Sequence, residues 1–243
     1  MTEHDNPSRS PFMRVEIWSD IACPWCYIGK RRFEKALAEF EHRDELEVIW
    51  RSFELDPNAP SGYEESQDVL LAKKYGVSAE QARAMTSRVA AEARKEGLEF
   101  RFDIMKPGNT FDAHRVAHLA ATVGLREAVV ERFFRGYFTE GAPIGDKATV
   151  LYLATDAGLE PAAVQATLDS DAYADAVRAD EARARSLGIT GVPFFAIDER
   201  YGVSGAQSPE MLLEALRRAH GESKLVVVAG NDEASCDDES CAI

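Results

Sequence analysis

The chain has 243 residues, 45% of them hydrophobic, which is enough to bury one sizeable core or a core with a satellite domain. Acidic side chains number 42 and Lys plus Arg 28, so the net charge is −14, and a chain this acidic is a poor general binder of nucleic acid because phosphate contacts need clustered basic residues. No segment approaches a transmembrane span, and residues 1–11 are polar and lack the apolar core of a secretory signal, so we expect a cytoplasmic protein with no membrane partner.

The first elements along the chain are expected to be a strand, a helix and a second strand. Residues 14–19 alternate, with Val15 and Ile17 on one side of an extended chain. Apolar residues at helical spacing follow over residues 24–41, and residues 46–53 read as the second strand. The order β-α-β indicates a parallel pair of strands joined by a crossover helix.

A long block over residues 64–187 has mostly helical periodicity. The exception is residues 98–104, in which apolar and charged residues alternate, and this pattern predicts an extended segment. Asn109 or Thr110 is then expected to cap the next helix, because both side chains can accept a hydrogen bond from the first turn.

Strand character returns after this block. Residues 193–198 are predicted to form a strand, residues 200–202 a turn and residues 203–205 a short strand. Ser208 and Pro209 are the residue types preferred at the cap and at the first position of a helix, so a final helix is expected to start there.

Joined across the helical block, the two strand-bearing parts would make one sheet, so the predicted fold class is α/β with a large all-helical insertion. We expect four parts along the chain. The α/β domain takes residues 12–63 and 188–230, the helical insertion takes residues 64–187, and residues 231–243 form an acidic flexible tail.

The segment Cys23-Pro24-Trp25-Cys26 lies between the first strand and the first helix. Pro24 suits the first helical position because it has no N–H to leave unpaired and its φ is preset. Cys23 then stands at the helix N-terminus, where backbone N–H groups favour thiolate over thiol. Cys26, one turn further on, is shielded by the helix. We therefore expect Cys23 to attack a disulfide and Cys26 to resolve the mixed disulfide.

Two cysteines at this spacing can also be half of a structural zinc site, or chemically inert. Zinc would need two more ligands, which Cys236 and Cys241 could supply in principle. A Pro-Trp insert that opens a helix after a strand fits redox chemistry better than a zinc knuckle, so the sequence favours the redox interpretation.

Residues 20–29 (DIACPWCYIG) resemble the active-site signature of the DsbA-like thioredoxin-fold superfamily, and within it the cytoplasmic FrnE-like thiol-disulfide oxidoreductases. Three more segments are similar to that group in the same order: residues 109–115 (NTFDAHR), 190–195 (TGVPFF) and 203–209 (VSGAQSP). The resemblance covers residues 14 to 220 approximately. It implies a thioredoxin fold (β-α-β … β-β-α) interrupted by the helical insertion, and the oxidation, reduction or isomerisation of protein disulfides.

The same resemblance implies a cis bond between Val192 and Pro193. That bond would open a strand beside the cysteines, and the neighbouring backbone would hydrogen-bond an extended substrate in the manner of a strand. The implied partners are protein thiols and disulfides, with the thioredoxin or the glutathione system as a possible electron donor. No cofactor is expected beyond the redox-active disulfide, and a glutathione site stays open.

The superfamily also contains 2-hydroxychromene-2-carboxylate isomerases and kappa-class glutathione transferases. These enzymes usually have serine at the position of Cys23 and use glutathione, whereas this chain keeps both cysteines. A glutathione-dependent isomerase or transferase is therefore the alternative function, and a zinc-binding, chaperone-like protein is a second alternative.

Three residues near these motifs are candidates for supporting roles. Trp25, expected to be exposed, either contacts substrate or only tunes the helix geometry. Asp20 either takes part in proton transfer or is a turn residue at the end of a strand. His114 is a candidate to line the cleft opposite Cys23. It shares a helix face with His118, but no carboxylate motif completes a metal site, so a packed pair is favoured and no metal is predicted.

The acidic tail holds Cys236 and Cys241, five residues apart. A disulfide between them requires a turn, since an extended chain would hold them about 17 Å apart. We hypothesise that this pair shuttles electrons to or from Cys23 and Cys26. The resemblance agrees with this, since some FrnE-like proteins also have a second Cys-x4-Cys pair near the C-terminus. Zinc capture and a passive tail are the alternatives.

Overall fold

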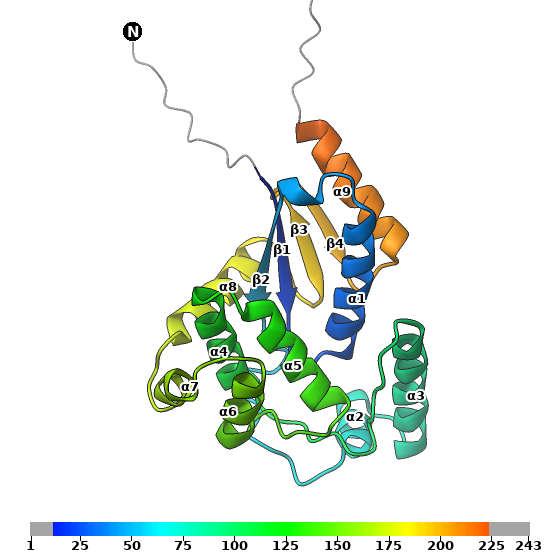
Figure 1. The fold of residues 1–243 in the computed structure, drawn as a ribbon. Coiled ribbons are helices and arrows are strands. Elements are labelled where there is room, and N and C mark those ends of the chain that lie inside the picture. Colours follow the sequence, from blue (N-terminus) through cyan, green and yellow to red (C-terminus); the bar gives the residue numbers. More distant parts are fainter. Residues whose placement is uncertain (1–11, 224–243) are drawn as a thin grey trace, which may run out of the picture.

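The structure, a computed structural model, describes residues 12–223 of the chain (Figure 1). The sheet-bearing part takes elements from both ends of this region, namely β1 (Met13–Ser19), α1 (Pro24–Glu39), the 3-10 helix η1 (Arg43–Glu45), β2 (Leu46–Ser52), β3 (Phe194–Ile197), β4 (Tyr201–Ser204) and α9 (Pro209–Ser223). Between β2 and β3 the chain is helical, with α2 (Gln67–Tyr75), α3 (Ala79–Lys95), α4 (Phe111–Thr122), α5 (Arg126–Phe138), α6 (Lys147–Asp156), α7 (Pro161–Leu168) and α8 (Ala174–Ser186).

The strands of the described chain form one sheet in the order β2-β1-β3-β4. β1 and β2 are parallel, β3 is antiparallel to β1, and β4 is antiparallel to β3. The connection from β1 to β2 passes through α1, as the β-α-β order predicts. Because β1 and β2 are parallel, the residues that follow them leave the sheet at the same edge, and the N–H of Phe53 donates to the carbonyl of Ser19 there at 3.2 Å.

Helices cover both faces of the sheet (Figure 1). On one face, α1 and α9 pack on the strands through a core that includes Ile17, Phe33 and Phe195. On the other face, Trp18 of β1 packs against Ala184 of α8. Both faces of β1 are therefore buried, one under α1 and α9 and the other under α8. α8 lies in the range expected for the insertion yet covers the sheet, and the domain boundaries stay a prediction.

The helical insertion has its own core, to which α5 contributes the fully buried Phe133, Phe134 and Phe138. The same core takes in Cys23 and Cys26 at the start of α1. The first turn of α1 therefore lies at the junction between the sheet-bearing part and the insertion.

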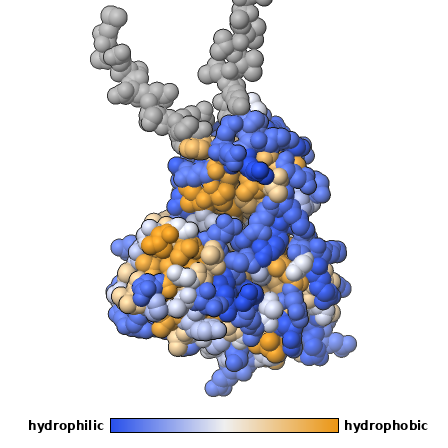
Figure 2. All heavy atoms as spheres, in the orientation of Figure 1, coloured by the Kyte–Doolittle hydropathy of each residue, from blue (hydrophilic) through white to orange (hydrophobic). Residues whose placement is uncertain are grey.

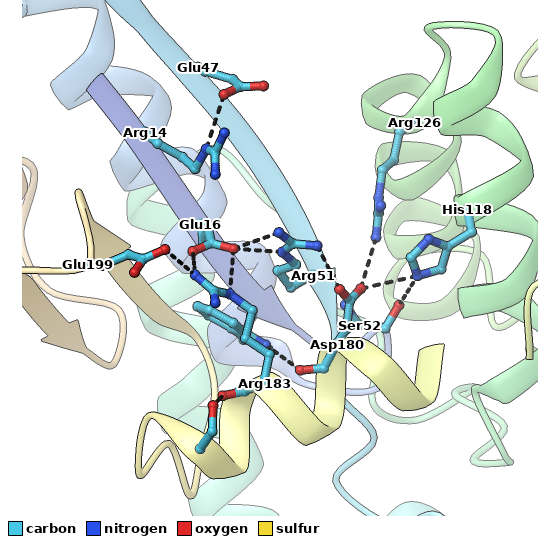
Figure 3. A network of polar contacts seen from close by, with 12 residues as sticks. Arg14, Glu16, Glu47, Arg51, Ser52, His118, Arg126, Asp180, Arg183 and Glu199 are labelled. Carbon is cyan, nitrogen blue, oxygen red and sulfur yellow. Dashed lines mark hydrogen bonds and ion pairs between the residues drawn. The ribbon is translucent and has the colours of Figure 1, made fainter. Parts of the chain in front are cut away.

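A polar network joins α8, the sheet and the insertion, with Asp180 of α8 at its centre (Figure 3). The Asp180 carboxylate accepts hydrogen bonds from the backbone N–H of Ser52 and from Nη1 of Arg51, both at 2.9 Å. His118 Nε2, from α4 of the insertion, lies 3.1 Å from the same carboxylate. The backbone carbonyl of Asp180 accepts from Trp18 Nε1 at 2.9 Å. One buried residue thus links all three parts.

The expected fold class, strands and helices in the order β-α-β and β-β-α around a helical block, is confirmed. Residues 98–104, expected to be extended, join no strand of the described chain, and residues 102–104 form a turn. Their alternation buries Leu98 and Phe100 in the insertion core, with the rings of Phe100 and Phe138 stacked at 4.6 Å.

The predicted turn at residues 200–202 and strand at 203–205 are wrong in register. β4 starts at Tyr201, and the turn comes earlier, where Asp198 and Glu199 have φ of 49° and 55°. Gly202, which suggested a turn, lies within β4, where a Cβ would come 2.7 Å from the ring of Phe194. The glycine therefore makes room for a cross-strand ring.

In residues 12–223, no helix has both the length and the apolar character needed to cross a bilayer. Figure 2 shows a largely hydrophilic surface on the side that faces the viewer, with apolar atoms gathered above the insertion, where the strands lie in Figure 1. Leu46 and Val48 of the edge strand β2 are only half-buried, which is consistent with apolar atoms at the surface there.

Candidate active site

The chain passes from β1 into α1 through a tight turn that places the first cysteine at the helix start. The N–H of Cys23 donates to the carbonyl of Asp20 at 3.1 Å, and the N–H of Cys26 donates to the carbonyl of Cys23 at 3.0 Å. Cys23 is the N-cap, with extended φ −91° and ψ 112°, and Pro24 is the first helical residue. No side-chain cap hydrogen bond forms at this helix end, which suits it to an anion at Cys23.

Both cysteines of this pair are reduced and buried, with 4% of Cys23 and 1% of Cys26 exposed. Burial raises the pKa of the Cys26 thiol well above its usual value, and the neighbouring Cys23 acts in the same direction. The backbone of Asp20 and the hydroxyl of Ser19 lower that pKa by smaller amounts. Cys26 therefore holds its proton and needs an acceptor before it can act as a nucleophile.

The loop before β3 lies directly against Cys23. The Val192–Pro193 peptide bond is cis, as expected, and Cys23 Sγ donates to the carbonyl of Val192 at 3.6 Å. The carbonyl of Pro193 accepts from the N–H of Gly205 at 2.8 Å, which fixes the loop to the segment after β4. The structure thus brings together two motifs that lie far apart in the sequence.

Gly29, in the second turn of α1, permits this close approach. A Cβ at Gly29 would lie 3.0 Å from Cγ of Pro193 and 3.5 Å from Cβ of Ala206, so the helix and the cis-proline loop touch where the side chain is missing. The sequence analysis assigned Gly29 no role beyond its place in the signature, since nothing local shows that another backbone passes there.

Asp20 is buried below the cysteines and accepts several hydrogen bonds. Its carboxylate accepts from the N–H of Leu55 at 2.7 Å and from the N–H of Ala22 at 3.2 Å, and it lies 3.4 Å from Nε2 of His114. Burial alone would raise the pKa of Asp20, but hydrogen bonds from His114, Leu55 and Thr110 hold it below its usual value. Asp20 therefore stays a carboxylate.

Glu54, which the sequence analysis missed, completes what we call the acid–histidine cluster of Asp20, Glu54 and His114. It is 5% exposed, its pKa is raised by burial, and Arg178 and the charge of His114 oppose that rise. Asn109 Nδ2 lies 3.5 Å from Glu54 Oε1. One signal pointed to it, because Glu54 follows β2 as Asp20 follows β1, and parallel strands end at one edge.

The remaining sequence candidates are dispersed. Trp25 is 39% exposed beside the cysteines, as expected. His118 contacts Asp180 and Ser52, whereas His114 contacts Asp20, so the two histidines have different partners. Cys236 and Cys241 lie outside the described residues, and the shuttle assigned to them stays a prediction.

Three comparisons place this chain among known proteins. A model of the DSBA-like thioredoxin domain matches residues 14–217. The uncharacterized protein YwbO of Bacillus subtilis is 28% identical over 206 residues, which cover 84% of this chain and 96% of that protein. The crystal structure of a probable DsbA oxidoreductase from Streptomyces coelicolor is 48% identical with a TM-score of 0.85, and the match covers 95% of this chain and 99% of that one.

Since the family model spans most of the chain, the protein belongs to the DSBA-like thioredoxin domain family. Its fold is the thioredoxin fold with a helical insertion between β2 and β3. A 2-hydroxychromene-2-carboxylate isomerase structure also matches, at 14% identity with a TM-score of 0.59, over 87% of this chain and 98% of that one. At that identity the likeness concerns the fold alone.

Proposed function

We propose that this protein is a thiol-disulfide oxidoreductase in which Cys23 exchanges disulfides with substrate and Cys26 resolves the mixed disulfide. The observation that carries the proposal is a pair of buried, reduced cysteines at the start of α1, with Cys23 against the carbonyl of Val192. The similarity to a probable DsbA oxidoreductase at 48% identity supports it. The FrnE-like assignment and a cytoplasmic location are the finer parts of the proposal.

The reaction can be written for reduction of a substrate disulfide. The Cys23 thiolate attacks one substrate sulfur, an S–S bond to Cys23 forms, and the other substrate sulfur leaves as a thiolate. The Cys26 thiolate then attacks the Cys23 sulfur, so the Cys23–Cys26 bond forms and the second substrate thiolate leaves. The substrate gains two electrons and takes up two protons, and the reverse sequence oxidises a dithiol. Net direction depends on the donor, for which we propose the thioredoxin or the glutathione system.

Protein substrates fit the surroundings of Cys23 better than small molecules do. The backbone of Val192, before the cis proline, can pair with an extended substrate segment, and the exposed Trp25 offers an apolar contact. A depression of about 500 Å³ opens between Leu55, Tyr63 and Leu70, and Leu55 is the residue whose N–H binds the Asp20 carboxylate. We propose that this depression receives an apolar side chain of the substrate polypeptide.

The proton that leaves Cys26 has a nearby destination. The backbone of Asp20 acts on the Cys26 thiol, so the acid–histidine cluster begins beside that sulfur. Asp20 is a weak base because its pKa is lowered, whereas the raised pKa of Glu54 lets that group hold a proton more readily. We propose that Asp20 holds His114 in place and that Glu54 takes up the proton.

Reduction of insulin by wild type, Cys23→Ser and Cys26→Ser tests the function. We expect Cys23→Ser to lose turnover, because no nucleophile remains. Cys26→Ser should lose turnover but accumulate a covalent mixed disulfide on Cys23, visible by mass spectrometry. Full turnover by Cys23→Ser would end the proposal.

The same proteins test the two alternatives from the sequence. A glutathione-dependent isomerase or transferase should bind glutathione saturably and keep its activity in Cys26→Ser. A zinc-binding chaperone should be purified with metal that is released when the cysteines are alkylated.

A further inference from the structure

Three side chains at the end of the molecule away from the cysteines converge on one point. His42 follows α1, Glu45 belongs to η1, and His220 lies in the last turns of α9. His42 Nδ1 lies 3.1 Å from one Glu45 carboxylate oxygen, and His220 Nε2 lies 3.2 Å from the other. One ligand atom from each of the three residues lies within 4.8 Å of the others. We call this trio the histidine–glutamate site.

The packing beneath the trio contacts both imidazoles. Their rings stack with centroids 3.8 Å apart, and the buried Phe40 meets each ring edge-on, at 5.8 Å from His42 and 5.9 Å from His220. α1 ends before Phe40, whose backbone is extended with φ −80° and ψ 122°. The Phe40 ring is buried. The fold therefore holds His220, whose side chain is 10% exposed, whereas His42, at 39%, has room to turn.

The charge around the site favours a cation. Residues 39–47 contain five carboxylates and one arginine, Arg43. Arg217 of α9 is paired with Glu41, with an Nε–Oε2 distance of 3.0 Å. The site is open on one side, since the side chains of His42 and Glu45 are 39% and 49% exposed, whereas that of His220 is 10% exposed.

We propose that His42, Glu45 and His220 bind one divalent transition metal ion of the zinc class. Two imidazole nitrogens with one carboxylate oxygen form a ligand set that zinc accepts, whereas calcium and magnesium prefer oxygen ligands. A tetrahedral zinc ion at its usual bond lengths needs donor atoms about 3.3 Å apart, and the exposed side of the trio leaves its fourth position to water. Nitrogen lone pairs lie in the ring planes, so the His42 side chain must turn out of the stack before its nitrogen faces an ion that His220 also binds.

This site is separate from the proposed redox centre. α1 has 16 residues, so its two ends lie about 24 Å apart, with the cysteines at one end and the trio beyond the other (Figure 1). The metal would fasten the last turns of α9 to the connection between α1 and β2. The metal-site proposal and the redox proposal can therefore fail independently of each other.

Zinc titration by calorimetry tests the proposal on the full chain with all four cysteines replaced by serine, so that no thiolate contributes. We expect one zinc ion per chain. His42→Ala and Glu45→Gln should each raise the dissociation constant for zinc about 10-fold or more, because each removes a direct ligand. Asp44→Asn is the matched control, since it removes an exposed acid from the same 3-10 helix, and it should change affinity less than about 2-fold.

Two more readouts keep the test decisive. Cobalt bound in place of zinc should give an absorption spectrum typical of nitrogen and oxygen ligands, and zinc should raise the melting temperature of the parent but not of His42→Ala. Because the His42 side chain is only half-buried, its replacement should not prevent folding. Absence of stoichiometric binding, or equal weakening by Asp44→Asn and Glu45→Gln, would overturn the proposal.

Discussion

At the scale of single residues, two buried carboxylates of one cluster have opposite pKa shifts. Asp20 receives hydrogen bonds from two backbone N–H groups and lies by His114, so its pKa falls although burial would raise it. Glu54 is also buried, and burial raises the pKa of Glu54 more than Arg178 and His114 lower it. The neighbours therefore decide which acid stays charged and which can carry a proton.

Asp20→Asn should slow resolution of the mixed disulfide about 10-fold or more, because the asparagine keeps the shape but loses the charge that orients His114. The rate should then rise more steeply with pH, since Cys26 must lose its proton to solvent. The rate at which Cys23 forms the mixed disulfide is measured by stopped-flow in the same variant. It should stay within about 2-fold of the wild-type rate.

Asp171→Asn, in the exposed segment before α8, is the matched control for this prediction. If Asp20→Asn slows both steps equally, or leaves the pH profile of resolution unchanged, then Asp20 has only a structural role.

At the scale of elements, α8 is the joint between the sheet and the insertion (Figure 3). Asp180 receives Arg51 and Ser52 from β2 and His118 from α4, and these contacts lower its pKa although burial would raise it. Burial lowers the pKa of Arg126 to about 10, although Asp180 opposes that shift. Charged side chains that are largely buried therefore hold α8 to β2 and α4.

Asp180→Asn should lower the free energy of unfolding by about 2–4 kcal/mol, because it takes the carboxylate away from the buried Arg126 and leaves Arg51 with Glu16 alone. Urea unfolding measures this loss. Glu47→Gln is the control, since it breaks the exposed pair with Arg14 and should cost less than about 1 kcal/mol. Equal losses in the two variants would contradict a special role for the joint.

At the scale of the whole molecule, acidity and stability are linked through a few buried carboxylates. Glu16, Asp20 and Asp180 have lowered pKa values, because arginine, histidine and backbone donors outweigh the effect of burial. Each contributes stability that is present above the pKa of an unfolded acid and is lost as pH falls through the lower folded value. Glu54, with its raised pKa, works in the opposite direction.

We therefore expect the free energy of unfolding to fall as pH drops below about 4, where unfolded Asp and Glu take up protons. Urea unfolding between pH 7 and pH 3 measures this. Asp180→Asn should show a shallower fall, since one of the three lowered carboxyls is gone. A wild-type stability that stays constant or rises between pH 5 and pH 3 would rule out this account.

The sequence by itself determined the features that depend on local pattern. Strand alternation, helical spacing and the Cys-Pro-Trp-Cys segment predicted the element order and the start of α1, because each is set by neighbours within a few residues. Even there, Gly202 misled the prediction of β4, since the ring that needs its space comes from another strand.

Only the tertiary structure decided which distant residues meet. Glu54 beside His114, Gly29 against Pro193, and His42 stacked on His220 join segments that no periodicity relates. The physical reason is that such contacts depend on how the helices pack around the sheet and the insertion, and close packing fixes them only when the whole chain is folded.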